Sequence, residues 1–186
     1  DYEKIANDEG RRIIAFGNYA GLAGMIDTLW SLGARLALEG IANPFEPLKQ
    51  ASQYEDLAAA KAAITAVGER IRTQGLPQQL VPLTIGIAGY GNVSKGAQEI
   101  LDLLPISDVA PADLLAGRLP EDSGHSILKI VFKEKDTVLP LVEGAAFDLQ
   151  DYYDHPERYR AAFERYLTHL TAFVNCIYWE PKYPRL

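Results

Sequence analysis

The sequence predicts an α/β fold in which a mainly parallel β-sheet is flanked by helices. Two apolar segments, 83–88 and 127–132, are too short for stable helices and too continuous for edge strands, which is typical of strands buried on both faces. Segments with helical periodicity come before and between them. Buried strands that alternate with helices favour a parallel sheet. With 186 residues, 48% of them hydrophobic and 23% charged, the chain has the size and composition of one globular domain.

The composition excludes several classes of protein. It is not that of a disordered chain or a collagen-like repeat, and the single cysteine, Cys176, excludes an internal disulfide. A formal charge of −7 without a basic patch argues against general nucleic-acid binding. No apolar run approaches the roughly 18 residues that span a bilayer, so we expect no membrane partner. One cysteine suits a reducing compartment, which predicts a cytoplasmic protein, or a mitochondrial-matrix protein if the source is eukaryotic.

The first part of the chain is expected to form a connector and two helices. Residues 1–17 open polar and end in a short apolar run, which is typical of an extended connecting segment. Apolar residues recur at helical spacings over 18–39, on more than one side, so this helix is expected to be buried or to join two domains. Ser52 and Glu55 have the spacing of a capping box at the start of a second helix over 52–73.

The middle of the chain is expected to alternate strands and helices. After the strand 83–88, Asn92 is a suitable cap for a helix over 93–104, which Pro105 ends. The elements expected next are a short second strand over 106–109, a helical turn over 111–116, a loop over 117–126 and the strand over 127–132.

The last part of the chain carries weaker patterns. Residues 133–150 fit no single element. His155-Pro156-Glu157 predicts the start of a helix over 155–172, because proline is favoured in a first helical turn. A last strand is expected over 173–179, in which Cys176 is an inert core thiol.

The most informative stretch is the turn between the strand 83–88 and the helix that follows it. Gly89 and Gly91 occupy two positions of a dinucleotide fingerprint, where the first glycine makes a tight turn and the second lets a pyrophosphate touch the backbone. Ser94 stands at the third position, where a small residue lets helix and strand pack closely. The helix N-terminus offers N–H groups and a partial positive charge to a phosphate. The stretch predicts a Rossmann-like fold and a site for NAD or NADP, formed by Gly89, Tyr90, Gly91, Asn92, Val93 and Ser94.

A ribose-binding acid is expected about 20 residues after the first glycine. Asp108 fits this distance, at the end of the short second strand, and a solvated loop aspartate is the alternative interpretation. A ribose contact from Asp108 would favour NAD, because the carboxylate would repel a 2′-phosphate. A P-loop for nucleoside triphosphates does not fit, because Gly96 is followed by Ala97.

The sequence offers no candidate for metal binding or for catalysis. His125, His155 and His169 are too widely spaced for a metal-ligand interval, and a single cysteine argues against a zinc site. No residue is a convincing proton donor or acceptor for hydride transfer to a carbonyl or an imine. We therefore expect no metal site and no catalytic residue in this chain.

Several segments together resemble the lysine-ketoglutarate reductase/saccharopine dehydrogenase family, which is similar to alanine dehydrogenase and to the transhydrogenase nucleotide-binding subunit. Residues 12–26 look like the interdomain segment of the family. Residues 89–98 resemble its dinucleotide loop, including the serine at the third position. Residues 155–159, 177–180 and 184–186 resemble its later segment, so the similarity touches most of the chain.

The resemblance implies a two-domain enzyme in which an N-terminal domain supplies a catalytic lysine and histidine and the other domain binds the dinucleotide. Residues 1–17 are then expected to be the tail of the N-terminal domain and a connector. Residues 18–186 would form the Rossmann-like dinucleotide-binding domain, including interdomain helices over 18–76. A start at Asp1 and an end at Leu186 fit an excerpt of a longer protein that is inactive alone. The expected partners are a dinucleotide and the N-terminal catalytic domain, with a homo-oligomer left open.

Two functions follow from these observations. The first is the NAD(P)-binding part of an amino-acid oxidoreductase that transfers a hydride to or from the imine of an amino acid and a 2-oxo acid. The second is a non-catalytic Rossmann-like module that senses a nucleotide or mediates assembly. The sequence decides neither the amino-acid substrate nor the choice between NAD and NADP.

Overall fold

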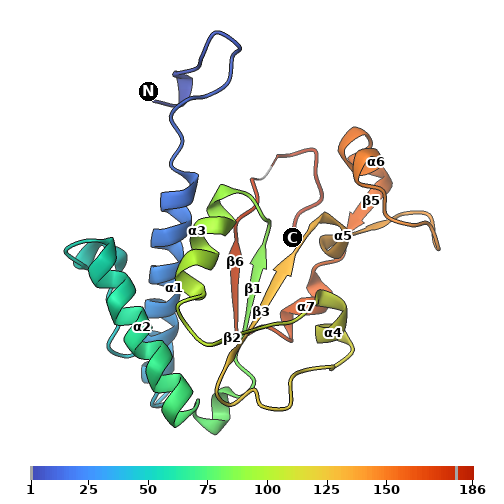
Figure 1. Ribbon diagram of the computed structural model, residues 1–186. Helices are drawn as coiled ribbons and strands as arrows, with labels where there is room; N and C mark the ends of the chain where they lie inside the picture. Colours follow the sequence, from blue (N-terminus) through green and yellow to red (C-terminus); the bar gives the residue numbers. More distant parts are fainter. Residues whose placement is uncertain (1, 179) are drawn as a thin grey trace.

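The computed structural model describes residues 2–178 and 180–186 and confirms the α/β class. Its central sheet has the strand order β2-β3-β1-β6, and every neighbouring pair is parallel (Figure 1). The four strands are β1 (Thr84–Ala88), β2 (Ile106–Asp108), β3 (Ile127–Phe132) and β6 (Ala172–Asn175).

The strand β1 lies inside the sheet, and all five of its residues are buried. It pairs with β3 on one side and with β6 on the other. The strand β2, which comes second in the sequence, lies outside β3 and pairs with it rather than with β1. The carboxyl ends of β3 and β6 therefore flank the turn that follows β1.

Three helices gather on one side of the sheet, namely α1 (Gly17–Leu38), α2 (Leu57–Gln74) and α3 (Asn92–Leu101) (Figure 1). Their apolar faces share one core with β1. Burial of each such side chain contributes about 1.5–3 kcal/mol to folding. The fully buried members of this core include Met25, Leu29, Ile64, Ile71, Ile85, Ile87 and Ile100.

A second core covers the other face of the sheet, beneath α4 (Pro111–Leu115) and α7 (Glu164–Leu167). Phe132 of β3 contacts Phe163 edge to face, with ring centroids 5.0 Å apart. Gly86 of β1 leaves room for this core, because a Cβ built there would lie 2.9 Å from the Phe132 ring and 2.8 Å from Leu170.

A small antiparallel unit follows β3 and lies at the carboxyl end of the sheet (Figure 1). It pairs β4 (Val138–Pro140) with β5 (Tyr159–Ala161) and includes α5 (Glu134–Thr137) and α6 (Leu149–Asp154). Val138, Tyr152 and Tyr159 form its buried centre. The described 3₁₀ turns are η1 (Tyr2–Lys4), η2 (Ala51–Gln53), η3 (Gln78–Leu80) and η4 (Pro156–Arg158).

The helices α1 and α3 touch backbone to backbone. A Cβ built at Gly21 would lie 1.9 Å from the carbonyl oxygen of Val93, and one at Gly96 would lie 2.1 Å from the carbonyl oxygen of Asn18. The two glycines therefore set the distance between the helices. Since Val93 stands in the first turn of α3, this contact also positions the turn after β1.

The structure corrects two expected helix starts. The expected capping box of Ser52 and Glu55 is not the start of α2, because Ser52 lies in η2. Asp56 caps α2 instead, and its carboxylate accepts a hydrogen bond of 2.7 Å from the backbone N–H of Ala59. The cap of α3 is Gly91 and not Asn92, which is the first helical residue.

Two further boundaries differ from the expectation. The helix α3 ends at Leu101 rather than at residue 104, because turns there direct Leu104 into the core. The helix expected over 155–172 is wrong, since η4, β5 and α7 occupy this segment. Pairing of β5 with β4 buries Tyr159, so tertiary contacts override the local helical spacing.

The ends of the chain are also less regular than expected. The N-terminal segment holds η1 and an isolated bridge between Ala6 and Arg12. The last strand, β6, ends before Cys176, which is half-buried, and burial raises the pKa of its thiol. Trp179, expected in that strand, lies outside the described residues. No helix in the described part of the chain is long and apolar enough to cross a membrane.

Candidate functional site

The turn after β1 is tight and is tied to both neighbouring strands. Gly89 has a φ of +94°, a left-handed conformation that glycine adopts without strain. Its N–H donates to the carbonyl oxygen of Phe132 at the end of β3. The N–H of Cys176, just after β6, donates to the carbonyl oxygen of Ala88. The tight turn expected at the first glycine is therefore present.

Gly91 stands where the backbone is open to a ligand. A Cβ built there would meet no atom within 4 Å, and no side chain caps α3 among the described residues. The N–H groups at the start of this ten-residue helix carry the positive end of its dipole. Gly91, Asn92 and Val93 line a cavity, so these groups lie at its wall.

The cavity has a volume of about 950 Å³, within the range of small-molecule sites. It is bounded by the turn after β1, by the segment after β3, by α6 and by the segment that follows β6. It thus opens at the carboxyl ends of β1, β3 and β6, which is where open parallel sheets bind ligands. Its polar and aromatic lining includes Tyr90, Lys133, Glu134, Tyr152, Tyr153, Asn175, Tyr178, Tyr183 and Arg185.

Glu134 connects three elements at this cavity. Its Oε1 atom accepts a hydrogen bond of 3.2 Å from the hydroxyl of Tyr90 in the turn after β1. The same atom accepts one of 2.8 Å from the hydroxyl of Tyr153 in α6. Lys133 lies with its ammonium 5.6 Å from the centre of the Tyr90 ring. The carboxylate is therefore held in place by two donors from different parts of the fold.

Aromatic rings join the segment after β6 to α6. The Tyr183 ring lies 5.2 Å from that of Tyr152 and 6.3 Å from that of Tyr153. Burial, together with the charges of Tyr183 and Glu134, raises the pKa of Tyr152 to about 12. Burial and the hydrogen bond to Glu134 also raise the pKa of Tyr153. Both hydroxyls therefore stay protonated at neutral pH.

The structure brings most of the predicted site residues together at the cavity, with Ser94 beneath them and Asp108 apart. Gly89, Tyr90, Gly91, Asn92 and Val93 lie together along the cavity. Ser94 is fully buried beneath them, and its hydroxyl accepts a hydrogen bond of 2.9 Å from the amide of Gln98, which fits a packing role.

Asp108 lies apart from the cavity. Its strand, β2, is separated from β1 by β3. Its carboxylate is 3.2 Å from the ammonium of Lys129, which also pairs with Asp102 at 2.8 Å. The structure therefore does not bring Asp108 to the turn after β1, and the ion pair with Lys129 engages it instead.

Glu134, Tyr153 and Tyr183 are cavity residues that the sequence reasoning missed. The acid that follows the strand next to β1 is Glu134, because β3 and not β2 is that neighbour. A signal was present, since Glu134 comes two residues after the buried segment 127–132. Only the spatial order of the strands shows that it belongs to the site.

The lining offers several groups that can bind a ligand. It contains no histidine among the described residues, and those residues hold no group of His, Cys, Asp and Glu that could bind a metal ion. Its acid, Glu134, is engaged by two tyrosine hydroxyls. A wall of N–H groups, a fixed carboxylate and aromatic rings can hold an anion, a hydroxyl-bearing group and a planar ring.

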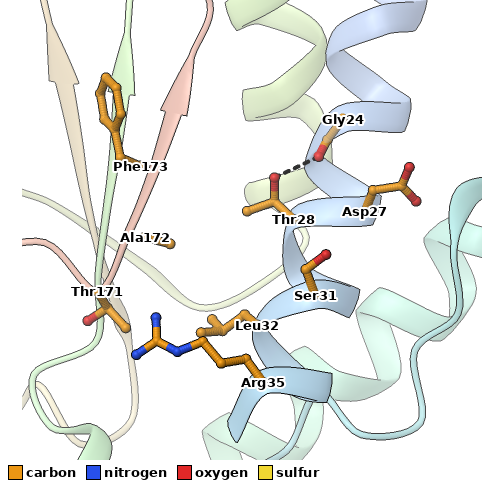
Figure 2. A pocket seen from close by; sticks show the side chains of 9 residues that line it. All are labelled: Gly24, Asp27, Thr28, Ser31, Leu32, Arg35, Thr171, Ala172 and Phe173. Atoms are coloured by element: carbon orange, nitrogen blue, oxygen red, sulfur yellow. Dashed lines mark hydrogen bonds between the residues drawn. The ribbon is translucent and has the colours of Figure 1, made fainter. Parts of the chain in front are cut away.

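A second hollow lies between α1 and β6, and Figure 2 shows its lining. It has a volume of about 480 Å³ and is more open than the first. Its charged groups are already paired, since Asp27 accepts a hydrogen bond from the N–H of Ala51 and Arg35 pairs with Glu39. Thr28 donates to the carbonyl oxygen of Gly24 within the helix (Figure 2). This hollow therefore offers less chemistry than the cavity beside Gly91.

Comparison with known proteins supports the resemblance read from the motifs. Over its full length the chain is 41% identical to an alpha-aminoadipic semialdehyde synthase of Arabidopsis thaliana, of which it covers 18%. It is 36% identical to the mitochondrial alpha-aminoadipic semialdehyde synthase of Mus musculus and 35% identical to that of Bos taurus, again over its full length. It covers 20% of each mammalian protein. The chain thus spans about a fifth of the length of these relatives, and no family model matches it.

Proposed function

We propose that this chain, a member of the lysine-ketoglutarate reductase/saccharopine dehydrogenase family, is the part of an oxidoreductase that binds a pyridine dinucleotide. Residues 18–186 form the binding unit in this proposal. The pyrophosphate lies against Gly91 and the first turn of α3. Gly89, Tyr90, Asn92 and Val93 shape the turn around it, and Ser94 packs the helix beneath.

One observation carries this proposal. Between the buried strand β1 and the helix α3, the backbone at Gly91 is open at the wall of a cavity of about 950 Å³. A phosphate fits there because the helix N-terminus provides both N–H donors and a partial positive charge. The position at the carboxyl ends of a parallel sheet is the one that dinucleotides use in such folds.

For the whole protein we propose hydride transfer to or from an imine of an amino acid and a 2-oxo acid, in lysine metabolism. The names of the relatives support a reaction on a lysine-derived compound. As the resemblance to the family implies, the catalytic groups in this proposal come from another part of the protein. The chain alone is then expected to bind the dinucleotide without turning it over.

Fluorescence titration with NADH and with NADPH tests the proposal. Binding quenches or enhances the nicotinamide emission, and we expect saturation by at least one of the two coenzymes. The chain should show no lysine-dependent oxidation of either coenzyme in the presence of 2-oxoglutarate. Absence of binding for both at millimolar concentration would refute the proposal.

A further inference from the structure

We propose that residues 180–186 form a strap over the cavity, and that the contact of the Tyr183 ring with Tyr152 and Tyr153 is a clasp that opens before a ligand enters or leaves. The inference rests on the proposed dinucleotide binding, because the coenzyme is the ligand that the strap would admit. It adds a conformational step to the binding reaction and assigns that step to one aromatic contact.

The strap leads from the edge of the sheet at β6 toward α6. Figure 1 shows the chain leaving the carboxyl end of β6 and turning back toward the carboxyl ends of β1 and β3. Tyr183, Pro184, Arg185 and Leu186 line the same cavity as Gly91. The strap therefore forms one wall of the cavity, and the turn after β1 forms another.

The chain just before the strap is anchored to the sheet. The N–H of Cys176 donates to the carbonyl oxygen of Ala88. Ile177 lies against the turn after β1, since a Cβ built at Gly89 would lie 3.2 Å from its Cγ1 atom. The N–H of Ile177 donates to the side chain of Asn175, at 3.0 Å. The sheet and its turn are thus fixed up to residue 177, so the strap beyond it can move without disturbing them.

Within the strap, the contacts join neighbouring residues to one another. The N–H of Tyr183 donates to the carbonyl oxygen of Glu180, at 3.1 Å. Lys182 pairs with Glu180 at 3.4 Å, and its ammonium lies 4.8 Å from the centre of the Tyr183 ring. These contacts keep the local shape of the strap, and all of them can persist while the strap moves as a unit.

The clasp joins the strap to a fixed aromatic platform. The Tyr183 ring lies 5.2 Å from that of Tyr152, with the planes inclined by 35°, and 6.3 Å from that of Tyr153. Tyr152 is buried and also contacts Tyr159 edge to face. Tyr153 donates a hydrogen bond of 2.8 Å to Glu134. A ring contact can break without leaving a buried polar group unpaired, so Tyr183 can leave the platform while the platform stays in place.

Closure of the strap has a kinetic consequence. A loop that covers a ligand shields it from water, and the ligand then binds and leaves only while the loop is open. At low coenzyme concentration the encounter limits association, whereas at high concentration the opening step limits it. The observed association rate should therefore reach a plateau, and this plateau measures the rate at which the clasp opens.

Stopped-flow fluorescence with NADH tests this step on the full chain of wild type and Tyr183→Ala. The association rate of wild type should level off as the NADH concentration rises, and Tyr183→Ala should raise the plateau by about tenfold, the effect of losing an aromatic contact of ordinary strength. If Tyr183 only packed against the coenzyme, its loss would speed dissociation and leave the plateau unchanged. Tyr19→Ala removes an exposed tyrosine of α1, outside the cavity, and should match wild type.

NMR relaxation dispersion on the free chain tests the opening without a ligand. The backbone amides of Lys182, Tyr183 and Arg185 should exchange between two states in microseconds to milliseconds, the time range of loop closure. Tyr183→Ala should abolish this exchange at Lys182 and Arg185, because the strap then stays open. The amide of Ile87, inside β1, is the control and should show no exchange.

The outcomes separate the two proposals. Binding of NADH without a plateau, an equal plateau in wild type and Tyr183→Ala, or no exchange at the strap amides of wild type overturns the strap and leaves dinucleotide binding intact. No binding of NADH or NADPH by correctly folded wild type overturns the proposed function, and with it the ligand that the strap would admit. Circular dichroism of each variant establishes that the fold is retained.

Discussion

Gly21 of α1 and Val93 of α3 approach so closely that a Cβ built on the glycine would lie 1.9 Å from the valine carbonyl oxygen. This contact places the first turn of α3 against the long helix α1. The wall of the cavity at Gly91, Asn92 and Val93 therefore depends on a helix contact on the side of the sheet away from α4 and α7. The contact between Gly21 and Val93 therefore links the stability of the fold to the shape of the proposed binding site.

Substitution of the contact glycines tests this link. Gly21→Ala and Gly96→Ala should each lower the free energy of unfolding by about 1–3 kcal/mol, because the added methyl group meets backbone atoms that cannot move aside. Gly24→Ala is the matched control, since a Cβ there meets nothing within 4 Å in the same helix. It should stabilise the chain by about 0.5–1 kcal/mol. Urea denaturation followed by circular dichroism measures the free energy of unfolding of all three variants. Equal effects of the three substitutions would contradict the close contact between α1 and α3.

Gly91→Ala separates binding from folding. Its added methyl group meets no protein atom, and the φ of −77° suits alanine, so the free energy of unfolding should be nearly unchanged. The methyl group would occupy the position of the pyrophosphate, so the Kd for the coenzyme should rise by about tenfold or more. Gly24→Ala again serves as the control and should bind as wild type does. Unchanged affinity in Gly91→Ala would place the phosphate elsewhere.

Lys129 forms an ion-pair cluster that is structural. Burial lowers the pKa of Lys129, but hydrogen bonds with Asp102 and Asp108 and the charges of these carboxylates outweigh burial and hold it above its ordinary value. Asp102→Asn combined with Asp108→Asn should destabilise the chain by about 2–3 kcal/mol, because the buried cation loses both partners. Lys129→Met should cost less than about 1 kcal/mol, since the carboxylates left behind are largely exposed to water.

The pH dependence of the stability that this cluster contributes follows from the direction in which the pKa of Lys129 is shifted. A raised lysine pKa contributes stability that is present in full below the unfolded-state value of roughly 10.4 and is lost as the pH rises through the folded-state value. The difference in free energy of unfolding between wild type and the double variant should therefore be constant from pH 6 to 9 and should shrink only above pH 10. A difference that already changes near pH 7 would exclude Lys129 as its cause.

Tyr152 should make the small antiparallel unit sensitive to alkali. Burial raises its pKa to about 12, and the unfolded value is about 10, so its contribution is complete below pH 10 and is lost as the pH rises toward 12. Between pH 9 and 11 the free energy of unfolding of wild type should fall by about 1 kcal/mol more than that of Tyr152→Phe. Tyr19→Phe, at an exposed position, should follow wild type. Parallel pH profiles for wild type and Tyr152→Phe would contradict the burial of this hydroxyl.

Local patterns predicted the parts of the fold that depend on local chemistry. The continuous apolar runs at 83–88 and 127–132 predicted β1 and β3 because a strand buried on both faces needs them. Gly89 predicted the turn because few other residues adopt its left-handed backbone. The long helix α1 followed from its apolar periodicity.

The parts that depend on spatial order were not predictable in this way. Spacing from Gly89 pointed to Asp108, whereas the sheet places β3 next to β1 and so brings Glu134 to the cavity. The approach of Gly21 to Val93 is equally non-local. The helical spacing over 155–172 was misleading, because pairing with β4 and burial of Tyr159 outweigh local propensity.

The most direct test of the central claim is an NMR titration of the isotopically labelled chain with NADH. The backbone amide resonances of Gly91, Asn92 and Val93 should shift most, followed by that of Glu134. The resonances of Ser31 and Ala172, in the hollow between α1 and β6, should stay in place. Largest shifts at Ser31 and Ala172, or no shift at Gly91 at saturating NADH, would contradict the assignment of the site.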